Sequence, residues 1–384
     1  MQQPTAKKPD TIQAVVDKKV KDLMRDWRRL VEVPYTASLA HTMNVLVANC
    51  VVAVPVAAPP GHWIGAGGSM IMEADKSTGV VRKHYIGMVT MLDILAHIAG
   101  SEDAHDSSGD LLDLDRKMAV PISSIIGHSV EGLSLWTLNP NTRYSARGST
   151  GHWFPVDGQV EEAVGVKLVE SATSYMMVTQ MDVLRFLRER TPEIKEILRQ
   201  SVKEMEGINE NVMAITDKTK LIEAIKCMKS SFLNAVPIVG GDHLHTQLIT
   251  VCLSLSLHFN CFFWDQIDSL SLFQGRGRKL VGTFSATDLR GCQLATLQTW
   301  LHRSVLDFTD AVRNSLLFEG SVAVGRELVT CRPESSLEEV MEKVVSKHVH
   351  RIWVIDEHGL LLGVVSLSDM IRVVRHSLLS QLHT

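Results

Sequence analysis

The sequence lacks the cysteine patterns of a zinc site or a disulfide scaffold. It has no CxxC pair and no zinc-type spacing. Isolated cysteines of this kind are typical of thiols in a reducing compartment. The N-terminal segment MQQPTAKKPD also lacks the apolar core of a signal peptide. We therefore expect a cytoplasmic or nuclear protein. The six cysteines lie at positions 50, 227, 252, 261, 292 and 331.

A strong charge of either sign is also missing. The formal net charge is −4 in 384 residues, which argues against a general nucleic-acid coat or a membrane-surface patch. The longest apolar run, at 248–264, contains His258 and Asn260 and is slightly short of a comfortable membrane span. We expect neither nucleic acid nor membrane among the partners.

One short phrase, in contrast, is written four times. It reads IGMVTMLDIL at 86–95, YMMVTQMDVL at 175–184, VGTFSATDLR at 281–290 and LGVVSLSDMI at 362–371. Each copy is an apolar, strand-like run followed by Ser or Thr, two spacers and an Asp that opens a helix-like run. A phrase repeated through a chain predicts an array of similar units. It also leaves little room for a catalytic domain.

The fourth unit gives the plan most clearly. Ser336 and Glu339 form a predicted capping box, followed by an apolar stripe at helical spacing. The runs HRIWVID and LLLGVVS then predict two strands, and Asp369 begins a closing helix. The unit is helix–strand–strand–helix. In units 1 and 3 we expect Thr36 and Asp217 to cap the first helix.

The predicted fold class is α+β with four such units. The organisation is a disordered N-terminal tail (1–17), unit 1 (18–99), an acidic linker (100–119), unit 2 (120–190), a connecting helix (191–207), unit 3 (208–296), a second connecting helix (297–318) and unit 4 (319–380).

Two segments depart from the plan. In unit 2 the spacing from Thr142 to Pro155 is too short for a first helix, and RYSARGSTGHWF has no helical stripe, so we expect that helix to be missing or a stub. Unit 3 carries an apolar insertion at about 246–274, with its Ser-, Leu-, Phe- and Cys-rich core at 250–273. The insertion is either a family-specific loop or a retained intron, because a pyrimidine-rich tract encodes those residue types.

These units resemble cystathionine-beta-synthase (CBS) domains. Four in tandem resemble the gamma regulatory subunit of AMP-activated and sucrose-non-fermenting-type kinases. The phrases EGLSLWTLNP (131–140), GRGRKLVGTFSATDLRGC (275–292) and VHRIWVIDEHGLLLGVVSLSDMI (349–371) resemble the plant gamma-like branch. The resemblance implies that units pair about pseudo-twofold axes, that two pairs form a disc, and that adenine nucleotides bind in clefts between units.

By this resemblance Asp369 would hold a ribose, Ser366 and Ser368 would assist sugar or phosphate, and His350 and Arg351 would face phosphates. The chemistry fits, because a carboxylate accepts from sugar hydroxyls and a guanidinium binds phosphate. Ordinary helix capping, worth about 1 kcal/mol, explains the same residues, and the alternative stays open. The remaining candidates are Thr90 and Asp93, Thr179 and Asp182, and Ser285, Thr287 and Asp288.

The expected function is a non-catalytic gamma-like subunit that binds a kinase catalytic subunit and a beta-type scaffold subunit. AMP, ADP or ATP would be a regulatory ligand, with no required cofactor. An alternative is a degenerate scaffold without nucleotide response, favoured by the basic residues missing from units 1 and 3. An enzyme is the third reading. We assign no catalytic residue, and neither the His243/His245 pair nor GAGG at 65–68 predicts a metal or phosphate site.

Overall fold

The computed structural model describes residues 15, 18–23, 30–49, 51–58, 85–100, 116–126, 178–241, 272–289, 299–314 and 328–382. Several predictions fall outside these residues and stay predictions. They are the disordered tail, most of the acidic linker, the missing helix of unit 2, most of the apolar insertion, the His243/His245 pair and the GAGG segment.

Unit 4 follows the predicted plan with one added strand. Its elements are β8 (Thr330–Cys331), α11 (Leu337–Lys347), β9 (Arg351–Ile355), β10 (Leu361–Ser366) and α12 (Leu367–Leu382). Ser336 caps α11, and its Oγ accepts from the backbone N of Glu339 at 3.2 Å, as predicted. The added strand β8 lies parallel to β9, and β9 pairs antiparallel with β10.

Units 1 and 3 repeat this topology. Unit 1 has β1 (Val33–Pro34), α2 (Leu39–Ala48), β2 (Ala53–Ala57), β3 (Tyr85–Thr90) and α3 (Met91–Gly100). Unit 3 has β4 (Met213–Thr216), α7 (Leu221–Ser230), β5 (Ala235–Val239), β6 (Phe273–Gln274), β7 (Leu280–Ser285) and the 3-10 helix η6 (Ala286–Leu289). The sheet orders are β1-β2-β3 and β6-β4-β5-β7.

The predicted caps of the first helices are corrected in both units. The N-cap residues are Ser38 and Lys220, not Thr36 and Asp217. The short strands β1 and β4 explain the shift, because the chain pairs with the following strand before it turns into the helix. In unit 3 this pairing still includes Asp217, whose backbone N donates to Val239 O at 3.2 Å.

The connecting helices are shorter than predicted. The segment 191–207 contains only α6 (Lys195–Leu198), because Thr191 does not cap a helix: its hydroxyl donates to Arg188 O at 2.6 Å. In 297–318 the described helix is α10 (Val305–Arg313), capped by Ser304. The remaining described elements are η1 (Val20–Leu23), η3 (Ile122–Ser124) and α5 (Gln180–Glu189), the closing helix of unit 2.

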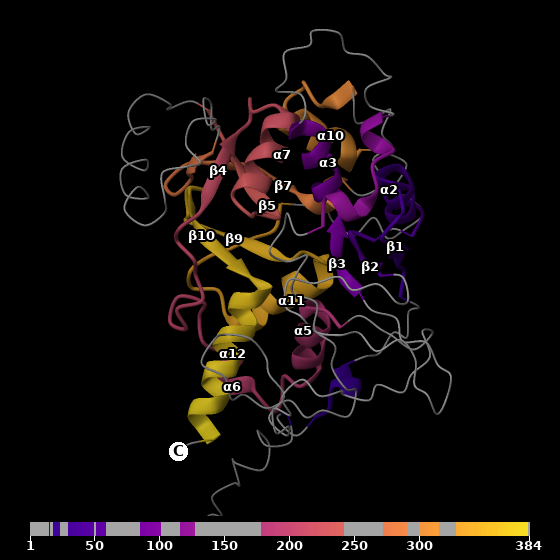
Figure 1. Ribbon diagram of the computed structural model, residues 1–384. Helices are drawn as coiled ribbons and strands as arrows, with labels where there is room; N and C mark the ends of the chain where they lie inside the picture. The colour runs from indigo at the N-terminus through magenta and orange to yellow at the C-terminus, as the bar shows by residue number, and fades with distance from the viewer. Residues whose placement is uncertain are drawn as a thin grey trace, which may run out of the picture.

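The apolar side chains gather into three clusters that join the units in pairs. One cluster joins units 1 and 3, where α3 lies beside α7 (Figure 1). A second joins units 2 and 4, where α5 packs against α11 and α12. The third lies between the sheets of units 3 and 4 and includes Ala214, Trp353 and Leu361. Each unit thus buries its apolar faces only with its neighbours.

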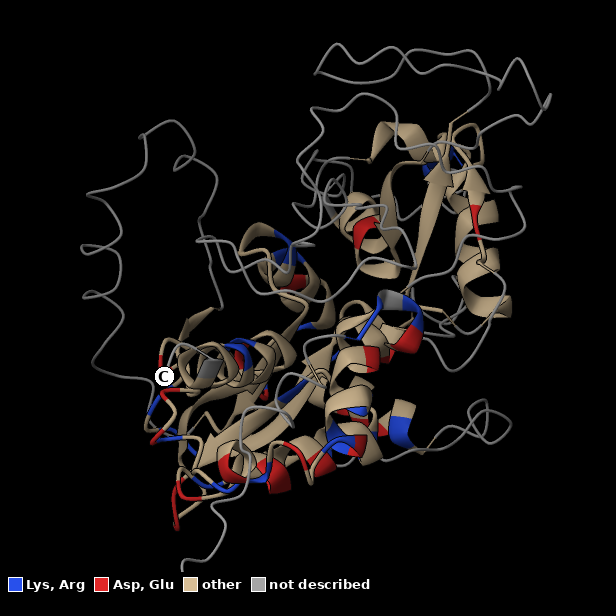
Figure 2. Cartoon of the chain, turned by 90° about the horizontal axis from the view of Figure 1, so that it is seen from below, with Lys and Arg blue, Asp and Glu red and all other residues tan. Residues whose placement is uncertain are grey.

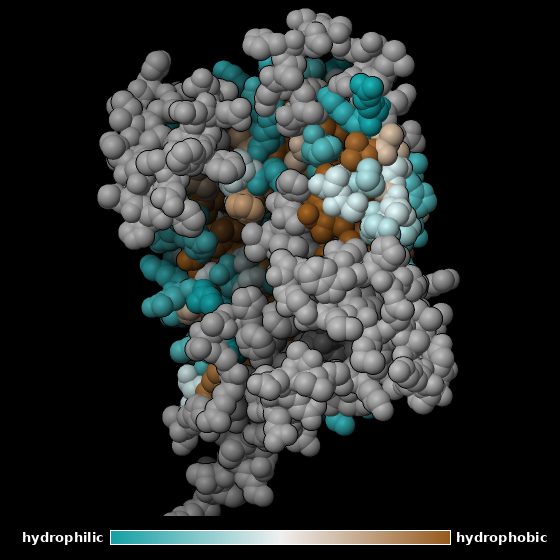
Figure 3. Space-filling view, in the orientation of Figure 1, coloured by the Kyte–Doolittle hydropathy of each residue, from teal (hydrophilic) through white to brown (hydrophobic). Residues whose placement is uncertain are grey.

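Charge is distributed unevenly over these units. Among the residues of β1, α2, β2, β3 and α3 in unit 1, Asp93 is the single Asp, Glu, Lys or Arg. Figure 2 shows this part of the chain as mostly tan, whereas blue and red crowd the helices of units 2 and 4. In the view of Figure 1, the surface beside α3 and that near β4 and β10 show apolar residues between polar ones (Figure 3).

Candidate functional site

The repeated Ser/Thr and Asp residues form the same local structure in units 1, 2 and 4. The hydroxyl residue ends the preceding segment, and the helix begins at the next residue: Met91, Gln180 and Leu367. The Asp therefore lies in the first turn, and each helix begins two residues earlier than predicted, since the sequence analysis placed its start at the Asp. From there its carboxylate reaches back to the backbone N and the hydroxyl of the Ser or Thr, which is a capping box.

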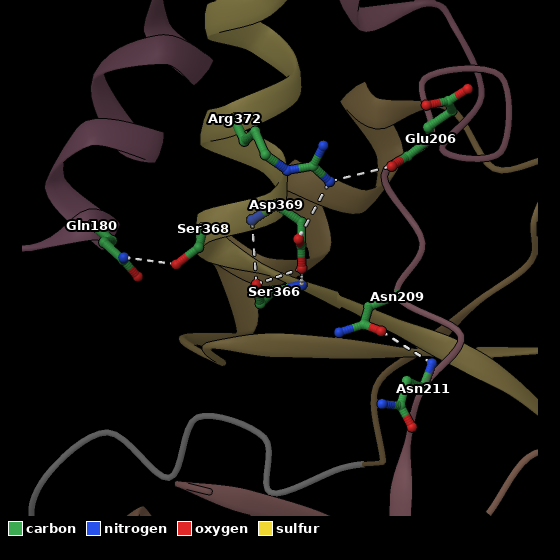
Figure 4. Close-up of polar contacts among 8 residues, drawn as sticks. All are labelled: Gln180, Glu206, Asn209, Asn211, Ser366, Ser368, Asp369 and Arg372. Carbon is green, nitrogen blue, oxygen red and sulfur yellow. Dashed lines mark hydrogen bonds and ion pairs between the residues drawn. The ribbon is translucent and has the colours of Figure 1, made fainter. Parts of the chain in front are cut away.

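In unit 4 this capping occupies one of the two carboxylate oxygens. Asp369 Oδ2 accepts from Ser366 Oγ at 2.6 Å and from Ser366 N at 3.0 Å (Figure 4). The second oxygen, Oδ1, lies 3.5 Å from Arg372 Nη2, which also donates to the carbonyl of Glu206. The Asp369 side chain is 21% exposed. Asp369 therefore caps the helix through Oδ2, while Oδ1 has only a weak contact with Arg372 among the described residues.

Arg351 links this motif to the one in unit 3. It pairs with Ser366 across β9 and β10, so both side chains lie on one face of the sheet. Its Nη1 donates to the backbone carbonyl of Ala235 in unit 3 at 3.2 Å. Ala235 in turn lies opposite Ser285, the first residue of the unit 3 motif. A guanidinium thus lies where the motifs of units 3 and 4 approach each other.

The unit 3 motif has a looser form. Asp288 Oδ2 accepts from Ser285 N at 2.7 Å, and Thr287 Oγ1 donates to Ser285 Oγ at 3.0 Å. The described residues that follow form the 3-10 helix η6. The Thr287 hydroxyl thus donates a hydrogen bond within its own motif.

The backbone carbonyl of His350 makes a hydrogen bond that recurs in all three described hairpins. Its carbonyl accepts from the backbone N of Leu367, as the carbonyl of Val52 accepts from Met91 in unit 1. The equivalent residue in unit 3 is Asn234, whose carbonyl accepts from Ala286. The side chain of His350 is exposed. The basic pair of unit 4 thus corresponds to Val52-Ala53 in unit 1 and to Asn234-Ala235 in unit 3.

The unit 2 motif lies against unit 4. Thr179 and Asp182 form a complete capping box at the start of α5. The next residue, Gln180, donates from Nε2 to Ser368 Oγ at 2.8 Å. Ser368 is thus held across the interface, a contact that the sequence analysis missed because its partner is 188 residues away.

Three arginines near the motifs of units 2 and 4 were also missed. Arg185 and Arg372 each follow the motif Asp by three residues, and this spacing on a helix was the available signal. Arg185 Nη2 lies 3.2 Å from His348 Nδ1, and Arg188 Nη1 lies 3.5 Å from Glu342 Oε1. Desolvation lowers the pKa of His348, and the charges of Arg185 and Arg188 lower it further.

The unit 1 motif meets unit 3, because α3 contacts both α7 and η6. Thr90 and Asp93 form the capping box, and Asp93 Oδ1 accepts from Nζ of Lys229 in unit 3. Asp93 is the most buried of the three motif carboxylates in ion pairs, with 5% of its side chain exposed. The structure therefore places the candidates of unit 4 against units 2 and 3, and those of unit 1 against unit 3.

The described parts of the chain contain no cluster of three or more His, Cys, Asp and Glu side chains that could hold a metal ion. Within the same residues, no helix has both the length and the apolar character needed to cross a membrane. Burial raises the pKa of the Cys331 thiol to about 12, which makes it a poor nucleophile at neutral pH.

Comparisons with known proteins agree with this architecture. A CBS-domain family model matches residues 321–376. The chain is 50% identical over 368 residues to the SNF1-related protein kinase regulatory subunit gamma-like PV42a of Arabidopsis thaliana, covering 93% of this chain and 95% of the relative. It is 47% identical over 372 residues to PV42b of the same plant, covering 94% and 96%.

Among solved structures, protein MJ1225 from Methanocaldococcus jannaschii, proposed as an archaeal homolog of g-AMPK, has the same fold. It aligns over 94% of this chain and 100% of its own, with a TM-score of 0.52 and 15% sequence identity. The predicted fold, four tandem CBS units paired into two modules of a disc, is confirmed by this likeness and the family match.

Proposed function

The chain belongs to the gamma-like family of SNF1-related protein kinase regulatory subunits, and from this membership we propose that it is a non-catalytic kinase subunit that binds an adenine nucleotide where units 3 and 4 meet. It would assemble with a kinase catalytic subunit and a beta-type scaffold subunit. Its relatives are named as regulatory subunits, which supports a regulatory role over an enzymatic one.

One observation carries the nucleotide part of the proposal. Asp369 keeps Oδ1 only loosely engaged, at 3.5 Å from Arg372, while Arg351 on the adjacent strand reaches the carbonyl of Ala235 in unit 3. A carboxylate oxygen can accept from a sugar hydroxyl, and a guanidinium can donate to a phosphate. AMP, ADP and ATP share both groups, so each is a candidate ligand.

The test is thermal stability with and without each nucleotide at millimolar concentration. Ligand at ten times its Kd stabilises the folded state by about 1.4 kcal/mol, so Tm rises by a few degrees. Asp369→Ala combined with Arg351→Ala should abolish the rise. Asp182→Ala is the matched control, because it removes the same capping box from α5 but leaves Asp369 and Arg351 in place.

Regulation requires that the nucleotide bind differently to the assembled and free states. We expect the protein to copurify with the catalytic and scaffold subunits, and the nucleotide to change the affinity of that assembly. No Tm rise with any nucleotide would contradict the ligand site, and loss of the rise in Asp182→Ala would contradict its assignment to units 3 and 4.

The second candidate is a scaffold that keeps the kinase contacts without a nucleotide response. The observation in its favour is that, among the described hairpins, Arg351 has no basic counterpart: the equivalent residues are Ala53 and Ala235. Stable copurification that no nucleotide alters would select this function over the first.

A further inference from the structure

The carboxylate of Asp93 is saturated by groups of the chain itself. Its Oδ2 accepts from Thr90 N at 2.9 Å and from Thr90 Oγ1 at 2.7 Å. Its Oδ1 accepts from Lys229 Nζ at 2.6 Å, and Lys229 comes from α7 of unit 3. Both oxygens thus have a close donor, and the Asp93 side chain is almost fully buried.

The equivalent carboxylates of units 2 and 4 differ in their outer oxygen. Asp182 Oδ1 and Asp369 Oδ1 face only an arginine of their own helix, at 3.4 Å and 3.5 Å. These side chains are 25% and 21% exposed, against 5% for Asp93. The same local motif is therefore open to a further hydrogen bond in two units and closed in unit 1.

Lys229 lies at a position that is apolar in the other units. The first helices of the three described units align by their N-cap residues, Ser38, Lys220 and Ser336. On this alignment Lys229 corresponds to Val47 in unit 1 and to Val345 in unit 4, and Val345 is buried. At this aligned position an ammonium group occurs in unit 3 alone among the three helices. It meets Asp93, the one Asp, Glu, Lys or Arg of β1, α2, β2, β3 and α3.

We infer that Lys229 converts the unit 1 motif from a sugar site into an ion pair that fastens unit 1 to unit 3. A ribose hydroxyl could reach Asp93 Oδ1 only by displacing the ammonium, which would leave a largely buried positive charge without its partner. Asp93 is then a structural residue, and nucleotide binding is confined to the other units. The exclusion of nucleotide from unit 1 rests on the proposed function, whereas the ion pair between units 1 and 3 does not.

A double-mutant cycle tests the fastening without nucleotide. Asp93→Asn and Lys229→Met each keep the size of the side chain and should each lower Tm by several degrees. The double variant should lose clearly less than the sum of the two, because each single variant leaves the other charge unpaired. Lys218→Met changes an exposed lysine just before α7 and should leave Tm within about 1 °C. Additive losses would overturn the inference.

Nucleotide titration of the same variants tests the confinement. Asp93→Asn should bind as many nucleotides as the unchanged protein, with affinities within about twofold. A reduced number of bound nucleotides in Asp93→Asn would make Asp93 a ligand and overturn the assignment. If no variant binds a nucleotide, the proposed function fails, and the coupling between Asp93 and Lys229 alone decides the inference.

Discussion

Units 1 and 3 are joined differently from units 2 and 4, although in each pair a helix that begins with the repeated motif, α3 or α5, packs against the partner unit. Between units 1 and 3, α3 and α7 share an apolar cluster crossed by one short ion pair, Lys229–Asp93. Between units 2 and 4, the apolar cluster is bordered by longer polar contacts, such as Gln180–Ser368 and Arg188–Glu342. The same repeat thus produces one interface whose ion pair is largely buried, between units 1 and 3, and one whose polar contacts are solvent-exposed, between units 2 and 4.

This difference has an energetic consequence. An exposed ion pair contributes roughly 0–1 kcal/mol, whereas breaking a buried pair costs about 3–5 kcal/mol. The ion pair between units 1 and 3 should therefore hold its geometry, while the exposed polar contacts at the edge of units 2 and 4 can rearrange at small cost. Because the Asp369 motif lies beside this edge, a ligand there would act on its polar contacts and not on the apolar cluster.

The largest expected loss of stability comes from truncating the buried residue just before the motif, which can be compared between units 3 and 4. Phe284→Ala should cost about 3–5 kcal/mol, because Phe284 is fully buried and packs edge-on against Phe308. Val365→Ala, at the equivalent position in unit 4, should cost about 2 kcal/mol, since fewer buried carbon atoms are removed than by Phe284→Ala. Chemical denaturation measures both losses. Val281→Ala, an exposed residue on the strand of Phe284, is the control.

A smaller effect is expected at the glycine that lies three residues before the motif in units 1, 3 and 4. A Cβ on Gly363 would lie 2.8 Å from the backbone oxygen of Asn209, which cannot move easily, whereas a Cβ on Gly282 would meet only side chains, at 3.3 Å or more. Gly363→Ala should cost about 1–3 kcal/mol, and Gly282→Ala less than about 1 kcal/mol. Equal shifts of the denaturation midpoint would contradict this distinction.

Local features of the fold could be predicted from the sequence. The apolar stripe of α11 and its cap at Ser336 were correct, because capping and helical periodicity depend on residues a turn apart. The caps at Thr36 and Asp217 were wrong, because the strands β1 and β4 are too short to leave a periodic signal. The long connecting helix after Pro192 failed for a related reason: tertiary contacts of the turn at Val202 with Ser335 replaced helical hydrogen bonds.

The site could be predicted only in part. The motif residues follow from the repeat, but their different roles depend on partners far away in the chain. Lys229 is 136 residues from Asp93, and Arg351 is 116 residues from the carbonyl of Ala235. The sequence did contain one signal for Lys229, because the equivalent positions in α2 and α11 are apolar. A charge in place of an apolar residue indicates a partner without identifying it.

The polar edge between units 2 and 4 can be tested with a third pair of variants. Gln180→Ala and Ser368→Ala should each cost about 0.5–1 kcal/mol, because they break one exposed hydrogen bond. Their double-mutant coupling should be similar in size. Gln200→Ala removes an exposed glutamine outside this contact and is the control. Coupling near zero would mean that the hydrogen bond does not help to join the two units.

The smallest effect concerns pH. Desolvation and two arginines lower the pKa of His348, so the folded state favours the neutral imidazole more than the unfolded state, where the pKa is about 6.5. Above that value both states carry a neutral ring and His348 adds no pH dependence. As the pH falls from there through the lower folded-state pKa, the unfolded state binds more protons and the folded state loses stability. Arg185, Arg188 and Asp182 are the charged groups near the ring.

His348→Asn should remove this part of the acid sensitivity. Asparagine is a suitable replacement because His348 ends α11 with a φ of 51°, a left-handed conformation that asparagine tolerates. Between about pH 7 and pH 5 the Tm of the variant should fall less steeply than that of the unchanged protein. His358→Asn, in the exposed turn before β10, should keep the original slope. Identical slopes in all three proteins would mean that Arg185 and Arg188 of α5 do not lower the pKa of His348.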